Sequence, residues 1–512
     1  MKIKDRLNTS AGTAVICSFV CGIAVHLFGL VNVLHNYDDI AVQPSGFGGG
    51  ISLGRWFLEI LGGFFDKCGL AYNLPFVNGV IFIGLIALSA GCFVSIFHVQ
   101  KRMFAALIGM LFAVFPTVTA TLFFRYTAPF YGVGILLAVL AAWISRKSKC
   151  GLILSAILTA LSMGIYQAYV PITIGIFVLL LIQQALEGKT DSRELIRRGL
   201  YDCMALLLGV IIYFFCLKVC MSIFSEPLTD YRGVSNMGQI RLHDLPSLIW
   251  QAFYSFCALP FRDYCELANR ALLKIAYILL AAITVVMIGI ILFVKVRNIK
   301  TAVMTCVLCL LFPIAVNFIV VMCPDNWIYT LMVYSFVLVA CVPLVLYEQL
   351  PSTEGILSIG KHIIAKSVGI IVAVLIFGYA YYANVNYTAL YYANCQVENY
   401  LNSIVVQVRM TEGFTTEKEW AFLGDIKDPL LSCYWEEAAD YGGSGFTEYF
   451  LNQYSRNAWI QNHVGYSVPM VSDEKIAELS NMREVEEMPC WPNQGSIKVV
   501  GDTVVVKFQN IQ

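Results

Sequence analysis

Two adjacent carboxylates, Asp38 and Asp39 in the run NYDDI, are the residues whose type and spacing most clearly favour chemistry. A carboxylate can take the proton from a hydroxyl group as its oxygen attacks a carbon atom, which typically contributes about 10² to 10⁴ in rate. Two neighbouring carboxylates repel each other, so the pKa of one of them rises and it becomes a better base near neutral pH. We therefore predict that Asp38 or Asp39 is catalytic. The alternative is a structural pair that ends a helix and hydrogen-bonds a turn.

Two arginines further along the chain have the side chain that suits phosphate binding. They are Arg55 in the run GRW and Arg125 in the run FFRYTAP. A planar guanidinium group pairs with phosphate oxygens through two parallel hydrogen bonds. We predict that both bind the phosphate of a donor substrate. The alternative for either one is a contact with a lipid headgroup or an ion pair with Glu59.

A third group of residues has polar or aromatic side chains suited to substrate contacts. Gln167 in the run GIYQAYVP can hydrogen-bond a sugar hydroxyl while a neighbouring tyrosine packs on the ring, or it can join two helices within a membrane. The predicted substrate contacts are Trp56, Glu59, Tyr126, Tyr166, Gln167, Arg232, Arg241 and His243. His243 lacks companions at metal-ligand spacing, so no metal site and no cofactor are predicted.

The elements that position these residues are those of a membrane protein. The 512 residues are 58% hydrophobic and only 13% charged, with a mean hydropathy of +0.71. Soluble domains are about 25% charged. Apolar runs of about 20 residues, enough to cross a bilayer, recur along the first three quarters of the chain. A large soluble core does not explain the length of these runs.

We predict eleven membrane spans. They cover residues 12–34, 76–98, 103–124, 128–145, 150–167, 170–186, 203–224, 273–294, 301–322, 327–347 and 364–383. An odd number of spans puts the two termini on opposite sides. The first span has no small-residue cleavage site after it and is expected to stay as an anchor.

The Lys and Arg residues near the span ends predict the orientation. Seventeen of them lie in or beside one set of loops, and only seven lie in the short loops on the other side. Positive loops are retained in the cytoplasm, so the N-terminus is expected inside and Asp38 outside. A sugar transferred outside the cytoplasm has no nucleotide donor, so a donor there would come on a lipid phosphate carrier.

Two outer loops have the strongest sequence signals. The loop 35–75 contains a Gly-rich bend, GFGGG, and then GRWFLEILGGFFDK, which predicts a short helix in the membrane interface. The alternative is a plain surface or re-entrant helix. The loop 225–272 mixes charged and aromatic residues, which suits a mobile lid, whereas a solvated connection is the default expectation.

The chain changes in composition near Asn384, and we place a domain boundary there, between 1–383 and 384–512. The second part has 17 Asp and Glu against 8 Lys and Arg, so it lacks the basic footprint of nucleic-acid binding. Helical spacing in CQVENYLNSIVVQVRM, a helix start at Ser472, a strand in EWAFLGDI and a hairpin at Gly501 predict a small α/β module.

Cysteine usage adds one open question about that module. Most of the 17 cysteines lie inside apolar spans, where a thiol is a small hydrophobic group. Cys395, Cys433 and Cys490 lie outside the spans, in a compartment where disulfides form. One disulfide is compatible with this trio, and its pairing is left open.

The order of the motifs NYDDI, GRW, FFRYTAPF and GIYQAYVP along residues 1–383 resembles that in the O-antigen serotype-converting glucosyltransferases of Gtr type II, within the GT-C superfamily. The spans and the charge distribution predict an all-α polytopic fold of about 11 helices with the acidic α/β module outside the cytoplasm, and the resemblance likewise implies a polytopic enzyme, of GT-C type. It also implies transfer of glucose or a related hexose from a polyprenyl phosphate to a cell-surface polysaccharide such as O-antigen or a wall glycan. An Asp of the first outer loop, Asp38 or Asp39, would be the base. The implied location is the cytoplasmic (inner) membrane.

Two other classes of function fit a polytopic chain. A transporter or flippase of lipid-linked oligosaccharides usually has internal repeats and charged groups at mid-membrane depth, which this sequence lacks. A polysaccharide polymerase or ligase relies on basic residues in large outer loops, and the arginines of residues 232–270 keep that alternative open. Under every alternative the expected partners include membrane lipid.

Overall fold

The computed structural model describes residues 9–147, 150–229, 241, 243–324, 327–351, 356–426, 428, 441 and 451–510. It forms two compact units, each with its own core. The first unit contains Met1–Asn32 and Gly46–Asn384, and the second contains Val33–Ser45 and Val385–Gln512. The short segment with Asp38 and Asp39 thus groups with the C-terminal residues, whereas the sequence analysis assigned it to the domain 1–383.

Long apolar helices dominate the described residues, as expected for a membrane protein. Eight helical stretches are long and apolar enough to cross a bilayer, and the bent pair α6 and α7 raises the number to nine. The eight are α2 (Ser10–Val31), α5 (Pro75–Ile96), α8 (Ala128–Ser145), η2 with α10 (Gln167–Leu186), α11 (Ser192–Phe224), α13 (Ala271–Lys295), α14 (Ile299–Val316) and α17 (Ile356–Met410).

Two further apolar stretches are shorter, α9 (Gly151–Ile165) and Tyr334–Gln349, which contains η5 (Tyr334–Phe336), α16 (Val337–Leu346) and η6 (Tyr347–Gln349). Every predicted span coincides with one of these stretches or with the bent pair. The polytopic helical class is therefore confirmed, and the count of eleven spans stays a prediction.

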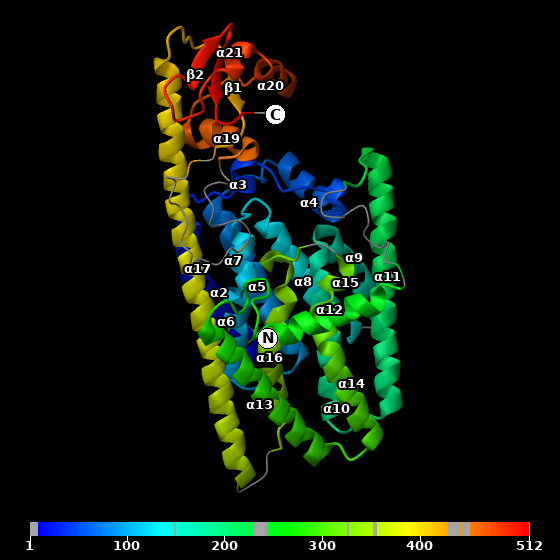
Figure 1. Cartoon of the computed structure of the whole chain (residues 1–512). Helices are drawn as coiled ribbons and strands as arrows, with labels where there is room; N and C mark the ends of the chain where they lie inside the picture. The colour runs from blue at the N-terminus through cyan, green and yellow to red at the C-terminus, as the bar shows by residue number, and fades with distance from the viewer. Residues whose placement is uncertain are drawn as a thin grey trace. The chain divides into compact units, whose positions relative to one another are not determined.

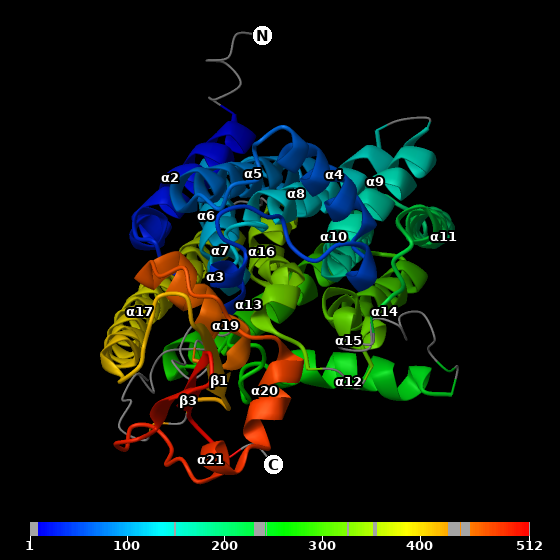
Figure 2. The same cartoon turned by 90° about the horizontal axis from the view of Figure 1, so that it is seen from above.

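Helices of the first unit pack side by side in the order α2, α5, α8, α9, α11, which Figure 2 shows as a continuous row. The helix α6 (Arg102–Val114) packs on α2 behind this row. At that crossing a methyl group on Gly109 would lie 2.3 Å from the carbonyl oxygen of Ala14. Small residues therefore permit the close approach of these two helices, as is common in membrane bundles.

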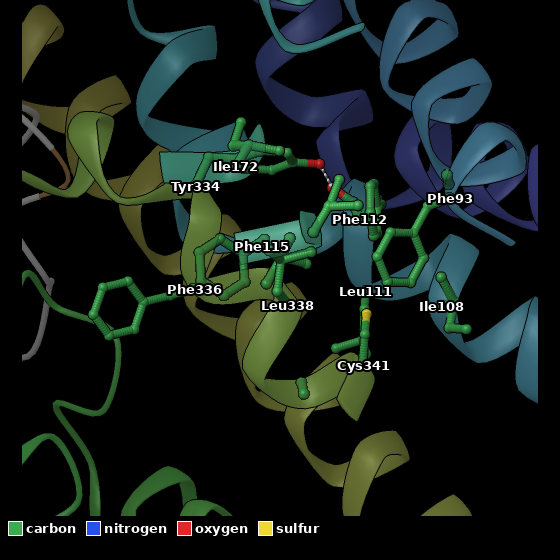
Figure 3. Close-up of a cluster of buried hydrophobic side chains, with 14 of the residues drawn as sticks. Phe93, Ile108, Leu111, Phe112, Phe115, Ile172, Tyr334, Phe336, Leu338 and Cys341 are labelled. Atoms are coloured by element: carbon green, nitrogen blue, oxygen red, sulfur yellow. Dashed lines mark hydrogen bonds between the residues drawn. The ribbon is translucent and has the colours of Figure 1, made fainter. Parts of the chain in front are cut away.

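The break between α6 and α7 (Pro116–Leu122) follows from a proline. Pro116 has no N–H to donate to the carbonyl of Phe112, four residues earlier, so the helix bends there by 40°. The hydroxyl of Tyr334 donates to that carbonyl at 2.9 Å, and Figure 3 shows this bond inside the cluster of buried aromatic side chains. A partner from another helix thus satisfies the freed carbonyl, which an apolar surrounding requires.

The helix predicted in the loop 35–75 is present as α4 (Trp56–Lys67), which follows η1 (Ile51–Leu53), and its place in a membrane interface stays a prediction. Its buried side is formed by Trp56, Leu58 and Gly62, while Ile60 and Phe64 are exposed. The apolar side chains of α4 are therefore divided between the protein core and the surface of the unit. Exposed large side chains on an amphipathic helix are typical of a helix that lies in a membrane interface.

The predicted lid loop also contains a helix, α12 (Leu245–Ala258). Its Leu248 and Ala252 are buried against α15 (Ile319–Met322). The side-chain amide of Asn317 donates to the carbonyl of Ala252 at 3.0 Å. In the described part of 225–272, a packed helix therefore stands where a mobile lid or solvated connection was expected.

The second unit has a three-stranded sheet in the order β1-β3-β2. Strand β1 (Glu419–Leu423) is parallel to β3 (Thr503–Lys507), and β2 (Ile497–Val500) is antiparallel to β3. The helices are α3 (Tyr37–Ala41), α19 (Gln453–Trp459), η7 (Ile460–Val464), α20 (Asp473–Ser480), α21 (Arg483–Glu486) and the end of α17 (Figure 1).

The predicted elements of the C-terminal module are confirmed. The hydroxyl of Ser472 caps α20, and Gly501 adopts a positive φ of 60° in the turn between β2 and β3. Cys395 and Cys490 are free thiols, and Cys433 lies outside the described residues.

Candidate functional site

The predicted site residues belong to both units, and we describe each unit by itself. The second unit contains Asp38 and Asp39, and the first contains the arginine and aromatic candidates. Arg232 lies outside the described residues.

The carboxylate pair stands in the first turn of the five-residue helix α3. The side-chain oxygen of Asn36 caps this helix by accepting from the backbone N–H groups of Asp38, at 3.0 Å, and of Asp39, at 2.7 Å. A short polar residue at the N-cap is a strong helix-starting signal, and acidic residues are favoured in the first turn. The pair therefore begins a helix, whereas the structural alternative had it end one.

Asp39 is fully buried and held by a histidine. Nδ1 of His35 donates to Oδ2 of Asp39 at 2.9 Å. The backbone of His35 is fixed in turn, because Oδ1 of Asn394 accepts from its N–H at 2.7 Å and Nδ2 of Asn394 donates to its carbonyl at 2.9 Å. Trp459 and His463 contact the His35 ring edge to face. Asp39 is thus part of a rigid interior.

Asp38 has a different environment, although it is the next residue. It is half-buried, and its Oδ1 accepts from the hydroxyl of Tyr454 at 3.0 Å. Tyr454 itself is 60% exposed. The structure therefore gives the two carboxylates distinct surroundings, one interior with an imidazole and one near the surface with a phenol.

In the first unit, Arg55 lies among tyrosines. Its guanidinium carbon is 4.9 Å from the ring centre of Tyr166 and 6.0 Å from that of Tyr131. Nε of Arg55 is buried and forms no hydrogen bond with the described residues. Nor does any carboxylate in the described part of the chain form an ion pair with Arg55, so the alternative pair with Glu59 is not found there.

The tyrosines themselves form a packed group. The rings of Tyr131 and Tyr166 stack with centres 5.0 Å apart, and Tyr169 meets both edge to face. An arginine side chain stays protonated in proteins, so the rings of Tyr131 and Tyr166 lie against a cation, as in a cation–π site.

Gln167 serves a structural role in the described contacts. Its Nε2 donates to the carbonyl of Leu53 at 2.9 Å and to the hydroxyl of Tyr213 at 3.0 Å. The hydroxyl of Tyr213 donates to the carbonyl of Gly54 at 2.9 Å, where the backbone has a positive φ of 74°. Both amide hydrogens of Gln167 are used in these bonds. Gln167 therefore joins η1 to α11, which agrees with the alternative that it links helices.

Three other candidates lie close to that turn or to the tyrosines. Trp56 is buried, and its indole N–H has no partner among the described residues. Tyr126 is also buried. Glu59 packs over Gly50, where an added methyl group would lie 1.8 Å from its carboxylate. Burial, and then the charge of Glu226, raise the pKa of Glu59.

Arg125 is only 2% exposed, and its carbonyl accepts from the side-chain amide of Asn78 at 3.2 Å. The residues Arg241 and His243, by contrast, are exposed. His243 pairs with Asp244 at 3.2 Å, and no described contact joins either residue to the group around Arg55. The structure thus brings together Arg55, Tyr126 and Tyr166, and leaves the two loop residues apart from them.

Several residues that hold the site were missed in the sequence. His35 lies four residues before Asp39 but precedes the N-cap of α3, so its nearness in sequence was the available signal. Tyr131, which directly follows the run FFRYTAPF that contains Arg125, was also available. Asn394 and Tyr213 are distant in sequence, and no local pattern marks them.

A family model described as Glucosyl transferase GtrII matches residues 27–340. The matched part includes the carboxylate pair, Arg55 and the tyrosine group. The chain has no significant match among curated proteins or among solved structures.

Proposed function

The chain belongs to the GtrII glucosyl transferase family, and from this premise we propose that it moves glucose or a related hexose from a polyprenyl phosphate to a cell-surface polysaccharide. The long apolar helices suit a donor that is embedded in a membrane. The family match favours sugar transfer over transport of a lipid-linked oligosaccharide. A glycosyl transferase needs a base for the acceptor and a counter-charge for the departing group, and we assign these roles next.

Asp38 is the proposed base. It takes the proton from an acceptor hydroxyl while that oxygen bonds to the anomeric carbon, and the bond from this carbon to the phosphate breaks with its electron pair going to the phosphate. Asp38 is the better candidate of the pair because it is half-buried and near a surface, whereas Asp39 is 0% exposed and engaged by His35. A base has to reach the hydroxyl that it deprotonates.

Arg55 is the proposed phosphate ligand, and its setting is the observation that carries the proposal. A buried guanidinium with ring faces around it and an unsatisfied Nε lacks an opposite charge in the described part of the chain. An uncompensated buried charge is costly, and an anionic ligand would supply the missing partner. A phosphate that gains charge as the sugar leaves fits this position. The second candidate for a phosphate ligand is Arg125, which is buried and directly precedes Tyr126.

The orientation belongs to the same proposal. With the N-terminus cytoplasmic, as the Lys and Arg distribution favours, the carboxylate pair faces the outside. We place the protein in the cytoplasmic (inner) membrane and the residues 384–512 outside the cytoplasm. The acceptor is then a surface polysaccharide, which is the partner that this side of a membrane presents.

Mass and linkage analysis of the cell-surface glycan, in cells with and without the protein, tests the proposal. We expect the wild type to add a hexose substituent, and Asp38→Asn to remove it. Asp66→Asn, an exposed carboxylate on α4, is the matched control and should keep the substituent. If no sugar depends on the wild-type protein, the transferase proposal is wrong. If Asp38→Asn keeps the substituent while Asp39→Asn loses it in a folded protein, the assignment of the base is wrong.

A further inference from the structure

A cavity lies in the first unit, and none of the residues that line it belongs to the tyrosine group. It has a volume of about 950 Å³ and is formed where α5, α8 and α10 end and α11 begins. Pockets for small molecules usually measure about 300 to 1,000 Å³. Its lining mixes charged residues with apolar ones, so it is suited to a ligand that has both characters.

Four cationic side chains line this cavity, namely Arg146, Lys147, Arg197 and Arg198. Lys147 is exposed, and its ammonium group lies 4.1 Å from the ring centre of Trp143 with no carboxylate bound to it among the described residues. Nε of Arg146 is buried and forms no hydrogen bond there either. Lys147 therefore has bonding capacity left for an anion, and the side chain of Arg146 is 21% exposed beside it.

The carboxylates of the lining are mostly engaged. Glu194 pairs with both Arg197 and Arg198, at 2.7 and 2.9 Å. Glu348 accepts from the backbone N–H groups of Gln100 and Lys101, each at 3.0 Å. Asp202, which does not line the cavity, forms an ion pair with Arg146.

Glu187, the third glutamate of the lining, is exposed to solvent, where its charge is screened. Among the described residues, Lys147 is thus the lining Lys or Arg side chain without a carboxylate partner, and it faces the cavity beside Arg146 and the exposed guanidinium of Arg197.

An apolar strip continues from the cavity along α11. Leu200 and Met204 line the cavity and are 61% and 58% exposed, and Leu207 and Ile211 follow on the same helix face at 64% and 56%. The spacing of three and four residues puts all four on one stripe of the helix. In a membrane, such an exposed stripe on a spanning helix contacts lipid chains.

From this arrangement we propose that the cavity binds the phosphate headgroup of an anionic phospholipid, with an acyl chain along the apolar stripe of α11. Arg146 and Lys147 supply the charge for the phosphate. Basic pockets between membrane helices are a known way of recognising anionic headgroups. The site does not depend on the proposed sugar transfer, and its test does not use activity.

The test is native mass spectrometry of the purified full-length protein in detergent, with phosphatidylglycerol, phosphatidylcholine or inorganic phosphate added separately. We expect phosphatidylglycerol to remain bound and phosphatidylcholine to be lost at the same concentration. Lys147→Gln with Arg197→Gln removes two exposed charges and should weaken phosphatidylglycerol binding by about fivefold per charge. Arg297→Gln with Lys300→Gln, two exposed charges outside the lining, is the control and should bind as the wild type does.

Three outcomes would overturn the proposal. Equal retention of the two phospholipids would show no selection of the anionic headgroup. Equal weakening by the control variant would show a general charge effect. Displacement of phosphatidylglycerol by inorganic phosphate at a concentration equal to that of the lipid would identify a free-phosphate site instead. A circular-dichroism melt of both variants confirms that they are folded.

Discussion

The surroundings of Arg55 in the first unit and of Asp39 in the second are opposites. Asp39 is a buried charge with a built-in partner, since His35 donates to it and Asn394 holds the backbone of His35. Arg55 has ring faces around it and no carboxylate partner in the described residues. Asp39 lies in the short helix α3, and Arg55 lies directly before the helix α4. The difference is therefore in the partner of the charge. Asp39 has a protein side chain as its partner, and Arg55 has no carboxylate partner among the described residues.

This difference indicates which charges are structural. A protein that buries an ion with its own partner gains a rigid local structure, and the ion is no longer available to a ligand. When a protein fixes a cation in place without an acidic partner, that cation can still attract an anionic ligand or a negative charge that develops during a reaction. Asp39 belongs to the first kind and Arg55 to the second. Asp38, bonded to an exposed tyrosine, lies between the two.

The largest effect is expected at Arg55. Arg55→Gln keeps a hydrogen-bonding side chain but removes the charge, and we expect the rate of sugar transfer to fall by about 10² to 10³. Sugar transfer in membrane vesicles, measured with a polyprenyl phosphate-linked hexose, tests this. Arg262→Gln, an exposed arginine of the first unit, is the control and should retain the wild-type rate. A variant at Arg55 that keeps full activity would contradict the distinction between the two charges.

The next largest effect is expected at Asn394, which holds His35, the partner of Asp39. Asn394→Ala removes two hydrogen bonds and leaves the buried N–H and carbonyl of His35 without this amide, which costs about 2 to 3 kcal/mol. We expect the amides of residues 33–45 to exchange with deuterium at least about 30-fold faster in hydrogen-exchange mass spectrometry. Asn402→Ala, on the same helix, should leave the exchange unchanged. Equal exchange in Asn394→Ala would show that the amide does not hold this segment.

The sequence predicted the helices and the charged candidates because both have local signals. Apolar runs locate the spans, and two β-rich runs around Gly501 locate the hairpin. The roles of individual candidates depend on contacts across the fold. The partner of Asp39 is His35, whose backbone is bonded by Asn394, more than 350 residues away, and no local pattern encodes that contact.

The same limit applies in the first unit. The run GIYQAYVP marks Gln167 as an unusual polar residue in an apolar segment, but its partner Tyr213 lies on another helix. The alternative of a helix-joining amide was available from the sequence, the packing shows that the amide hydrogens have this role, and a sugar contact by Gln167 stays a prediction. Prediction from the sequence is therefore strongest for residue types and weakest for what they touch.

A smaller effect is expected at the turn that positions Arg55. Tyr213→Phe removes the hydroxyl that donates to Gly54 and accepts from Gln167, with little change in volume. The loss of these buried hydrogen bonds should cost about 1 to 2 kcal/mol and lower the melting temperature by a few degrees. Tyr254→Phe, an exposed tyrosine of the same unit, should melt as the wild type does. An unchanged melt of Tyr213→Phe would mean that the turn is held by other contacts.

The smallest effect is expected at Glu59. Asp39 has a histidine partner, whereas the folded protein disfavours the charged form of Glu59. Burial and the charge of Glu226 raise its pKa, so the folded state binds a proton more tightly than the unfolded state does. This contribution to stability is present below the pKa of the unfolded chain and is lost as the pH rises through the raised folded pKa. Glu59→Gln should therefore flatten that decline, and melting from pH 4 to pH 8 measures it. Asp66→Asn on the same helix should keep the wild-type slope, and an unchanged slope in Glu59→Gln would show that Glu59 does not couple to folding.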